Sequence, residues 1–325
     1  MAASPAGVLV TGNIVHDILV RPVEQIRWGT SAWVESIETH LGGNGANTSY
    51  CVAKLGVRVR LLGSVGMDVF GAQCLTWLES AGVDLSSVFR STLAPTATTV
   101  GLVHPSGDRH FLHQPGVSRH AFTSAIAFSP MLTQGFGRYH LANVFALRGL
   151  RRYARETLAA ARESGLVTSL DTGWDPLGEW LDLIGPCLPL VDYLFVNEDE
   201  ARMLTGSAEP AEASRRLLDH GASHVIVKLG AGGCAVCGPT APILAPAFEV
   251  DCVDTTGAGD CFTGGFLTAL ARGAALEEAA SLANAAGALS IGQLGAVEGL
   301  LGYEDTLDWM RKTPRRTLRT SHPGG

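Results

Sequence analysis

Residues 254–262, DTTGAGDCF, place three small residues directly before a lone acid at the expected start of a helix. The first turn of a helix leaves backbone N–H groups without intrahelical partners and carries partial positive charge, so it binds anions. Gly257, Ala258 and Gly259 offer little or no side chain there, which lets a phosphate approach the backbone closely. The segment therefore predicts an anion cradle for a phosphoryl group.

The acid that follows the cradle, Asp260, needs a chemical reason for its position because phosphate oxygens repel a carboxylate. It becomes useful if it takes a proton from a substrate hydroxyl while the cradle holds the phosphoryl group under attack. On this interpretation Asp260 is a general base. The motif alone leaves a second interpretation open, in which Asp260 is a first-turn acid that stabilises its own helix.

Two common phosphate-binding motifs are missing from the sequence. A GxxxxGK[ST] loop cannot occur because no glycine is followed by lysine, and GGNGANTS (residues 42–49) lacks the last glycine of GxGxxG. A P-loop enzyme and an ordinary dinucleotide enzyme, such as a dehydrogenase, are therefore disfavoured.

The composition favours an enzyme that acts on small molecules. Apolar residues make up 46% of the 325 residues, which is enough for a sizeable core. The formal net charge of −7, from 24 basic and 31 acidic residues, argues against a nucleic-acid footprint over the whole surface. Length alone allows one large α/β domain or two ordinary ones.

The seven cysteines are odd in number and scattered through apolar stretches, unlike a secreted disulfide framework. We expect them to be reduced and mostly buried. Cys234 and Cys237 have CxxC spacing, but no second CxxC or His pair accompanies them, so a zinc site is not expected. No basic segment precedes the short apolar run at the N-terminus, and no apolar stretch reaches about 18 residues, so we expect a cytoplasmic protein with no membrane partner.

Short β-branched runs alternate with longer segments of helical period, which predicts a mostly parallel sheet whose strands are joined by helices. Several strands end in Gly, Asn or Asp, where open α/β sheets place ligands. The expected strands are 8–12, 58–66, 167–171, 193–197 and 224–230. The expected helices are 44–55, 71–81, 150–164, 210–220, 257–272 and 276–292.

Two regions, about 14–41 and 96–113, interrupt this alternation. The second predicts a hairpin that turns at 105–107, and together the two regions predict a small sheet that projects from the core as a lid. The C-terminal tail, from about residue 312, is basic and rich in turn formers. We expect it to be mobile and solvated rather than a nucleic-acid arm.

With these motifs in place, the sequence closely resembles the ribokinase-like (PfkB) carbohydrate kinases over about residues 7–310. Two motifs in the right order carry the resemblance, GGNGANTSYCVAKLG (42–56) and DTTGAGDCFTGGFL (254–267). VNEDEA (196–201) and VIVKLGAGG (225–233) lie where the family has its metal-associated and nucleotide-binding segments. The resemblance implies one kinase domain over 1–325, a three-layer α/β sandwich with a small β lid, and ATP-dependent phosphorylation of a sugar hydroxyl.

The resemblance also implies roles around the phosphoryl group. Asp260 matches the catalytic base, and Gly257, Ala258 and Gly259 match the anion hole, in agreement with the chemistry above. Asn197 and Glu200 match the N-x-x-E that helps to hold Mg²⁺ and its waters near the phosphates. An alternative is that Asn197 and Glu200 merely cap and open a helix after a strand.

Further residues match the family's nucleotide and cation sites. Lys228, Gly230 and Gly233 match the nucleotide-binding turn, where Lys228 would neutralise phosphate charge, and Asn284 matches a segment that lines the adenine pocket. A monovalent cation such as K⁺ often lies beside the anion hole in this family. Asp254 and the loop 292–296 would contribute to such a site here.

On the acceptor side, Asn13 and Asp17 match residues that hydrogen-bond substrate hydroxyls. Gly43, Asn44 and Asn47 would supply a close backbone approach and amide groups, which both donate and accept and so suit a polyol. Asn44 is alternatively an ordinary helix N-cap, and the two roles are compatible.

One departure from the family leaves the acceptor open. The ribokinase branch has a Glu after the HL of its central strand, whereas this sequence has Ala142 and Asn143, so ribose specificity does not follow. Asp171 ends a strand near the expected phosphate channel, without an assigned sugar contact.

Two other functions stay open at this point. A nucleoside kinase would need apolar or aromatic side chains to sandwich a base, and Trp28, Trp33 or Phe111 are the candidates. A sugar-binding regulator that has lost catalysis is disfavoured by the intact acid, anion hole and N-x-x-E. In several family members the lids pair across a homodimer, and the sequence does not decide whether they do so here.

Overall fold

The computed structural model describes residues 7–317, and its central element is a nine-stranded sheet in the order β13-β12-β11-β10-β9-β8-β1-β4-β5. Neighbouring strands are parallel except for β12 and β13, which join the edge antiparallel. The strands are β1 (Gly7–Thr11), β4 (Val59–Gly66), β5 (Val88–Ser91), β8 (Phe136–Leu141), β9 (Val167–Asp171), β10 (Tyr193–Asn197), β11 (His224–Lys228), β12 (Cys234–Cys237) and β13 (Ile243–Ala245). The expected parallel sheet is confirmed.

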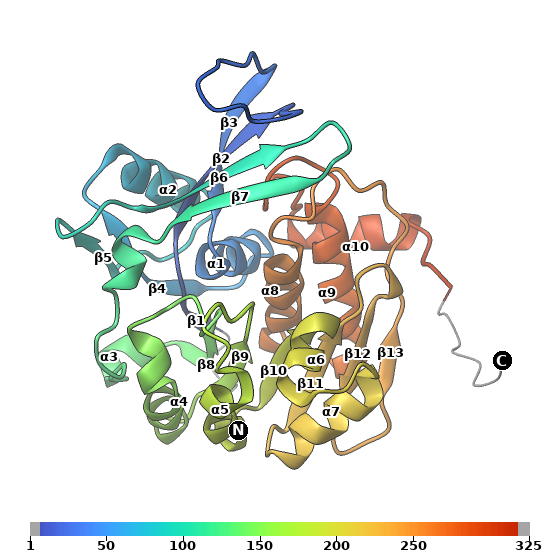
Figure 1. The fold of residues 1–325 in the computed structure, drawn as a ribbon. Helices are drawn as coiled ribbons and strands as arrows, with labels where there is room; N and C mark the ends of the chain where they lie inside the picture. The colour runs from blue at the N-terminus through green and yellow to red at the C-terminus, as the bar shows by residue number, and fades with distance from the viewer. Residues whose placement is uncertain (1–6, 318–325) are drawn as a thin grey trace.

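Helices cover both faces of this sheet, which makes a three-layer sandwich (Figure 1). The α-helices are α1 (Asn44–Lys54), α2 (Val69–Ser80), α3 (Pro130–Thr133), α4 (Ala154–Glu163), α5 (Trp180–Ile184), α6 (Glu198–Thr205), α7 (Pro210–Asp219), α8 (Ala258–Ala271), α9 (Leu276–Ser290) and α10 (Tyr303–Lys312). Short 3₁₀ turns lie at Gly116–Arg119, Leu150–Tyr153, Gly185–Leu190 and Gly230–Gly232. The expected helix over 150–164 therefore begins as a 3₁₀ turn, and α3, α5 and α10 were not expected.

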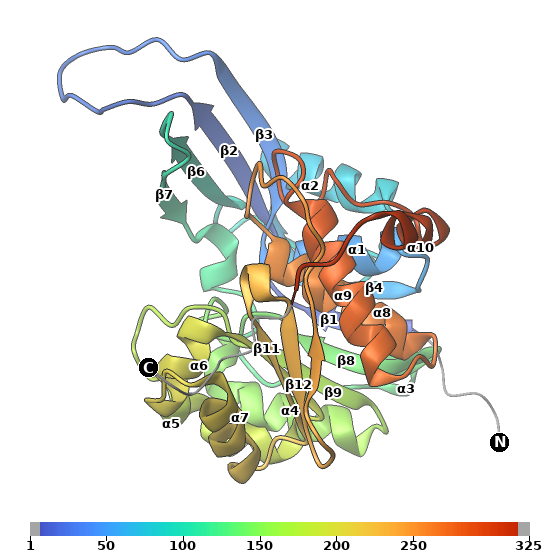
Figure 2. The same cartoon turned by 90° about the vertical axis from the view of Figure 1, so that its right-hand side faces the viewer.

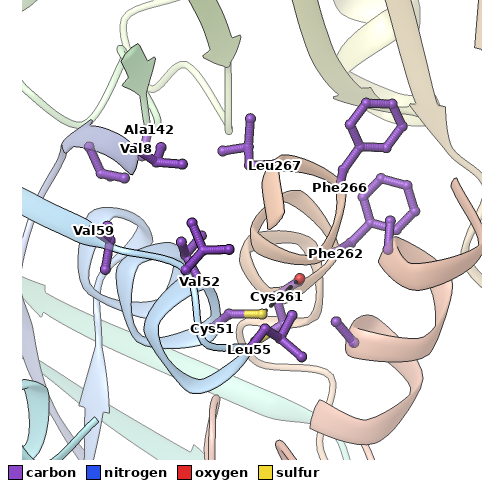
Figure 3. Packing of buried hydrophobic residues seen from close by; sticks show 14 of the residues in the cluster. Val8, Cys51, Val52, Leu55, Val59, Ala142, Cys261, Phe262, Phe266 and Leu267 are labelled. Carbon is purple, nitrogen blue, oxygen red and sulfur yellow. Dashed lines mark hydrogen bonds between the residues drawn. The ribbon is translucent and has the colours of Figure 1, made fainter. Parts of the chain in front are cut away.

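Alternate residues of β1 enter two separate cores because successive side chains of a strand point to opposite faces. Val8 and Val10 pack with α1, α2, α8 and α9, whereas Leu9 packs with α4 to α7. Figure 3 shows the first of these cores, where α1 and α8 lie so close that the Cys51 thiol donates to the Cys261 carbonyl at 3.3 Å. This packing fixes the N-terminal ends of α1 and α8 relative to each other.

A second sheet of four strands, in the order β3-β2-β6-β7, stands off one end of the sandwich (Figures 1 and 2). We call it the small sheet. Its strands are β2 (Val15–Arg21), β3 (Ser36–Gly42), β6 (Ala97–Val103) and β7 (Arg109–Gln114). The hairpin expected at 105–107 is confirmed, since β6 and β7 pair antiparallel around a turn closed by the Gly107 and His104 backbones. The β2–β3 connection extends far from the core in Figure 2.

The C-terminal tail, expected to be mobile, is paired with the core as far as the structure describes it. The Glu249 amide donates to the Pro314 carbonyl at 2.9 Å, and the Arg316 amide donates to the Ala247 carbonyl at 2.8 Å. Residues 318–325 of this tail lie outside the described residues.

Two smaller expectations can be compared with the structure. All seven cysteines are free, and Cys252 is the exposed one among them. Within residues 7–317, no helix has the length and apolar character needed to cross a bilayer.

Candidate active site

The predicted anion cradle lies at the start of α8. Gly257 caps the helix in the left-handed conformation, with φ of 71°. A Cβ on Gly257 would lie 2.5 Å from the Ala296 Cβ, so both its backbone angle and its neighbour require glycine. Ala258, Gly259 and Asp260 form the first turn, and together with Gly257 they line a cleft.

Asp260 is 8% exposed, and its two carboxylate oxygens have separate amide donors. Asn44 Nδ2 donates to Oδ1 at 2.8 Å, and Asn47 Nδ2 donates to Oδ2 at 2.9 Å. Burial raises the pKa of Asp260 to about 6, although the two amides act in the opposite direction. An acid that only stabilised its own helix would not need this burial or these partners.

Both amide side chains, Asn44 and Asn47, lie in the first turn of α1. Its N-cap is Gly43, so the alternative in which Asn44 is an ordinary N-cap is wrong. Instead, the Asn44 backbone N–H donates to Asn13 Oδ1 at 2.9 Å. Asn13 thereby ties the end of β1 to α1 and leaves the Asn44 side chain directed at Asp260. A Cβ on Gly43 would lie 2.6 Å from the Asn13 carbonyl oxygen.

Asn143 extends this network, although the sequence drew attention to it only as a departure from the family. Its Nδ2 donates to Asn44 Oδ1 at 2.8 Å, and its Oδ1 accepts from the Ala146 amide at 3.1 Å. Its φ of 49° is in the left-handed region that Asn tolerates better than most residues. The chain Asn143–Asn44–Asp260 therefore fixes which atom of the Asn44 amide faces the carboxylate.

Lys228 provides a positive charge beside the anion cradle. Lys228 Nζ contacts Asp171 Oδ2 at 2.9 Å, and Thr263 Oγ1 donates to the same oxygen at 3.0 Å. Burial acts to lower the pKa of Lys228, but the charges of Asp171 and Glu200 outweigh burial and hold it above its ordinary value. A Cβ on Gly259 would lie 3.4 Å from Lys228 Nζ, so the ammonium group is beside the cradle.

Asn197 and Glu200 form a reciprocal capping box at the start of α6, so the capping alternative is present in the structure. Glu200 Oε2 accepts from the Asn197 amide at 2.9 Å and from Thr172 Oγ1 at 3.2 Å. Glu200 also lines the cleft and is 6% exposed. Burial raises the pKa of Glu200, Lys228 opposes this, and Asp171 adds to it.

The cleft has a volume of about 580 Å³ and brings the predicted nucleotide residues together with the cradle. The predicted residues in its walls are Asn44, Asn197, Glu200, Lys228, Gly230, Gly233, Gly257, Ala258, Gly259, Asp260 and Asn284. The remaining predicted acceptor residues are not in these walls; they are Asn13, Asp17, Gly43 and Asn47. Asn284 Nδ2 donates to the Ala245 and Pro246 carbonyls at 2.9 and 3.2 Å, which fixes one edge of the cleft.

Several residues of the cleft were missed from the sequence. Phe248, Val250 and Arg316 line it, and none belongs to a recognised motif. Arg316 comes from the C-terminal tail and reaches the cleft because the tail pairs with residues 247–249. Asp171 also lines the cleft, which gives it a place beside Lys228 that the sequence left unassigned.

Asp17 lies on β2 of the small sheet, and its charge interacts with those of Asp254 and Asp260. Its carboxylate lies over Gly42, where a Cβ would come within 2.1 Å of Oδ2. Burial raises the pKa of Asp17 to about 6, Thr99 and His40 oppose this, and the negative charges of Asp254 and Asp260 add to it. Asp17 and Asp260 are thus close enough for their charges to interact.

Asp254, expected at a monovalent-cation site, is 1% exposed and already well bonded. Its Oδ1 accepts from the Thr256 amide at 2.7 Å and from Arg109 Nη1, and its Oδ2 accepts from the Gly295 amide at 3.0 Å. Burial raises the pKa of Asp254, but these hydrogen bonds and the Arg109 charge outweigh burial and hold the pKa below its ordinary value.

A family model described as pfkB family carbohydrate kinase matches residues 6–301. The chain belongs to this family. Its fold agrees with that of Arabidopsis thaliana ribokinase in complex with ribose and ATP, with a TM-score of 0.83 at 27% identity, over 95% of this chain and 99% of that one.

Two curated proteins are similar to this chain in sequence. The ATP-dependent ribose-1-phosphate kinase of Halopiger xanaduensis is 33% identical over 89% of this chain and 93% of that protein. The aminoimidazole riboside kinase of Salmonella typhimurium is 30% identical over 80% of this chain and 84% of that protein. The chain is therefore an ATP-dependent kinase of this family, and the alternative of an inactive regulator loses its support.

Proposed function

We propose that this kinase transfers the terminal phosphoryl group of ATP to a hydroxyl of a small sugar or sugar-like acceptor, with Asp260 as the general base. The observation that supports this most is the position of Asp260. It is buried in the first turn of α8, held by two neutral amides, and shares a cleft with Lys228 and the bare amides of 257–259.

The proposed chemistry uses each of these groups. The acceptor hydroxyl gives its proton to Asp260 as the hydroxyl oxygen attacks phosphorus. A pKa of about 6 leaves Asp260 ionised at neutral pH, yet makes it a stronger proton acceptor than an ordinary aspartate. The N–H groups of Gly257, Ala258 and Gly259 and the Lys228 ammonium stabilise the negative charge on the transferring group.

The chain offers residues that fit Mg²⁺, although the described residues contain no group of three or more His, Cys, Asp or Glu side chains that could hold a metal alone. Mg²⁺ keeps several waters and binds through one or two carboxylates plus substrate phosphates. Glu200 fits this pattern because its carboxylate lines the cleft and a nearby cation would offset its burial. Asn197 would act by holding Glu200, since its Oδ1 already accepts from the Glu200 amide at 2.8 Å.

The test is a panel of pentoses, hexoses, keto-deoxy acids, sugar phosphates and nucleosides, scored for Mg²⁺-dependent ADP release by the wild type and Asp260→Asn. We expect at least one acceptor to be phosphorylated by the wild type and turnover to be lost in the variant. Transfer by Asp260→Asn at the wild-type rate would contradict the assigned base.

A nucleoside acceptor is the second candidate, and Phe111 favours it. Phe111 lies on the same face of β7 as Arg109 and His113, and Arg109 contacts the core, so this face is directed at the acceptor region. Trp28 and Trp33 are 96% and 99% exposed in the β2–β3 connection, which begins at the end of β2 away from the core. We expect Phe111→Ala to raise KM for nucleosides more than for sugars.

The small sheet is proposed as a lid over the acceptor, since Asp17 and Arg109 face the core from it. Closure would exclude water and favour transfer over ATP hydrolysis. Saturating acceptor should then slow hydrogen exchange in 14–41 and 96–113. Unchanged exchange there would contradict the lid.

A homodimer through the small sheet is proposed from the exposed apolar side chains of the β2–β3 connection and the start of β3. Ile26, Trp28, Trp33 and Ile37 are each more than half exposed. Such a group of apolar side chains is commonly covered by a partner. Light scattering should give twice the chain mass for the wild type and a single chain mass for Trp28→Ser/Trp33→Ser.

A further inference from the structure

One arginine of the small sheet reaches the turn that precedes the anion cradle. Arg109 is the first residue of β7, and its Nη1 donates to Asp254 Oδ1 and, at 3.0 Å, to Thr256 Oγ1. These partners are 145 and 147 residues away in the sequence. A positive charge from the β6–β7 hairpin therefore lies directly beside the loop that leads into α8.

The carboxylate it meets organises that loop. Asp254 Oδ1 accepts from the Thr256 amide, and Oδ2 accepts from the Gly295 amide on a separate loop. Gly257, which follows this turn, touches the residue after Gly295, since a Cβ there would collide with Ala296. Asp254 thus holds together the two loops whose contact sets the conformation of Gly257.

The charge on Asp254 has to be compensated. A carboxylate that is 1% exposed is costly to bury without a cation, and it would repel the phosphoryl group held at Gly257 to Gly259. Arg109 provides the compensation in an ion pair whose arginine side chain is 17% exposed. The guanidinium therefore cancels a negative charge where negative charge would oppose the reaction.

The monovalent cation that the family resemblance suggested does not fit this arrangement. Asp254 Oδ1 already accepts two hydrogen bonds, which is the usual capacity of one carboxylate oxygen. A bound K⁺ would also share the carboxylate with a guanidinium, and like charges that close repel each other. The residues present suit an arginine rather than a free ion.

We propose that Arg109 supplies, from the small sheet, the positive charge beside the anion cradle that a monovalent cation would otherwise provide, so that this kinase needs no added K⁺. The inference rests on the proposed function of the cradle. Arg109 is a positioning residue, because it acts on the phosphoryl group through Asp254 and the turn 254–257. Since it belongs to the small sheet, its charge is in place only while that sheet lies against the core.

The test compares wild type, Arg109→Ala and Arg109→Lys in KCl and in tetramethylammonium chloride at equal ionic strength. We expect wild-type kcat to be the same in both salts. Arg109→Ala should lower kcat by about tenfold or more, with a smaller change in the KM for acceptor. Guanidinium chloride below denaturing concentrations, or KCl, should restore part of the loss, and Arg109→Lys should keep more activity than Arg109→Ala.

Arg21→Ala is the matched control. Arg21 lies on β2 of the same sheet, pairs with Glu38 at 3.0 Å, and both side chains are about 40% exposed. We expect Arg21→Ala to keep wild-type kcat in both salts. A wild type that K⁺ activates several-fold would overturn the inference, as would an Arg109→Ala variant with normal kcat or with a loss that neither guanidinium nor K⁺ restores.

A separate measurement distinguishes failure of this inference from failure of the proposed function. If the wild type phosphorylates no acceptor in either salt, the proposed function is contradicted, and hydrogen exchange still tests the contact. Arg109→Ala should speed amide exchange at 254–257 and at Gly295, whereas Arg21→Ala should not. Unchanged exchange in Arg109→Ala overturns the inference whatever the activity.

Discussion

Asp260 and Asp171 are both buried in one cleft, but their partners are of opposite kinds. Asp260 is held by the neutral amides of Asn44 and Asn47, whereas Asp171 is held by the Lys228 ammonium and the Thr263 hydroxyl. Neutral donors orient a carboxylate without cancelling its charge, so its affinity for a proton stays high. An ammonium cancels the charge. The difference supports the proposal that Asp260 accepts the proton and that the Asp171–Lys228 pair compensates charge.

The largest effect should come from removing the proton acceptor. Asp260→Asn should lower kcat by about 10² or more, in line with general-base contributions. The fold should persist because Asn47 Oδ1 has no hydrogen-bond partner within residues 7–317, so the Asn47 amide can turn and accept from the new side chain. Steady-state kinetics and circular dichroism provide the measurement. Asp171→Asn should cost less, and equal losses in the two variants would erase the distinction between the aspartates.

Removing the cation tests the other half of the comparison. Lys228→Met leaves Asp171 and Glu200 buried without their positive charge, which should lower the free energy of unfolding by about 3–5 kcal/mol. Urea unfolding measures this change. The double variant Lys228→Met/Asp171→Asn should recover part of the loss, because the uncompensated carboxylate is then removed. A single variant as stable as the wild type would show that the ion pair compensates no buried charge.

The pH dependence of kcat/KM tests the role of the Asn44 and Asn47 amides. Asp260 must be ionised to accept a proton, so wild-type kcat/KM should fall as the pH drops through about 6. Asn47→Ala removes one hydrogen bond to the ionised form and should move this acid limb upward by about one pH unit. The measurement is kcat/KM from pH 5 to 8. A limb that stays in place would mean that Asp260 is not the titrating group.

The smallest effect is expected at Glu200, whose charge interacts with Lys228. Glu200→Gln keeps a side-chain oxygen for the capping box but loses the charge, so the Mg²⁺ concentration for half-maximal activity should rise by about tenfold. Activity at saturating Mg²⁺ should change less. The titration is made at fixed ATP and acceptor, and an unchanged Mg²⁺ requirement would remove Glu200 from the metal assignment.

The two motifs that carry Asn44, Asn47 and Asp260 could be predicted from the sequence because each is one continuous stretch. The contacts of the two amides with Asp260, which lies 216 and 213 residues away, could not. Residues 42–49 contain the N-terminus of α1, and 254–260 contain that of α8. A positive φ favours glycine at one position in each, Gly43 and Gly257. The sandwich could be predicted for a similar reason, since the alternation of apolar periods along the chain specifies parallel strands joined by helices.

The contacts around Lys228 and Arg109 could not be predicted in the same way. Asp171 meets Lys228 across 57 residues and Thr263 across 92, through the pairing of β9, β10 and β11 and the docking of α8. Strand alternation indicates that Arg109 shares a face with Phe111, but it does not indicate which core residue that face meets. Asn143 was visible as a departure from the family, yet its contact with Asn44 depends on a left-handed backbone that one sequence does not reveal.

A single residue, Gly43, separates the end of β3 from the start of α1. The small sheet, proposed as the lid, and the Asn44 amide that contacts Asp260 therefore belong to consecutive parts of one chain segment. This has a practical consequence for building chimeras with other family members. A β2–β3 hairpin should be transplanted as part of the whole segment 12–47. A junction placed at Gly42 or Gly43 would combine the small sheet of one protein with the Asn44 geometry of another.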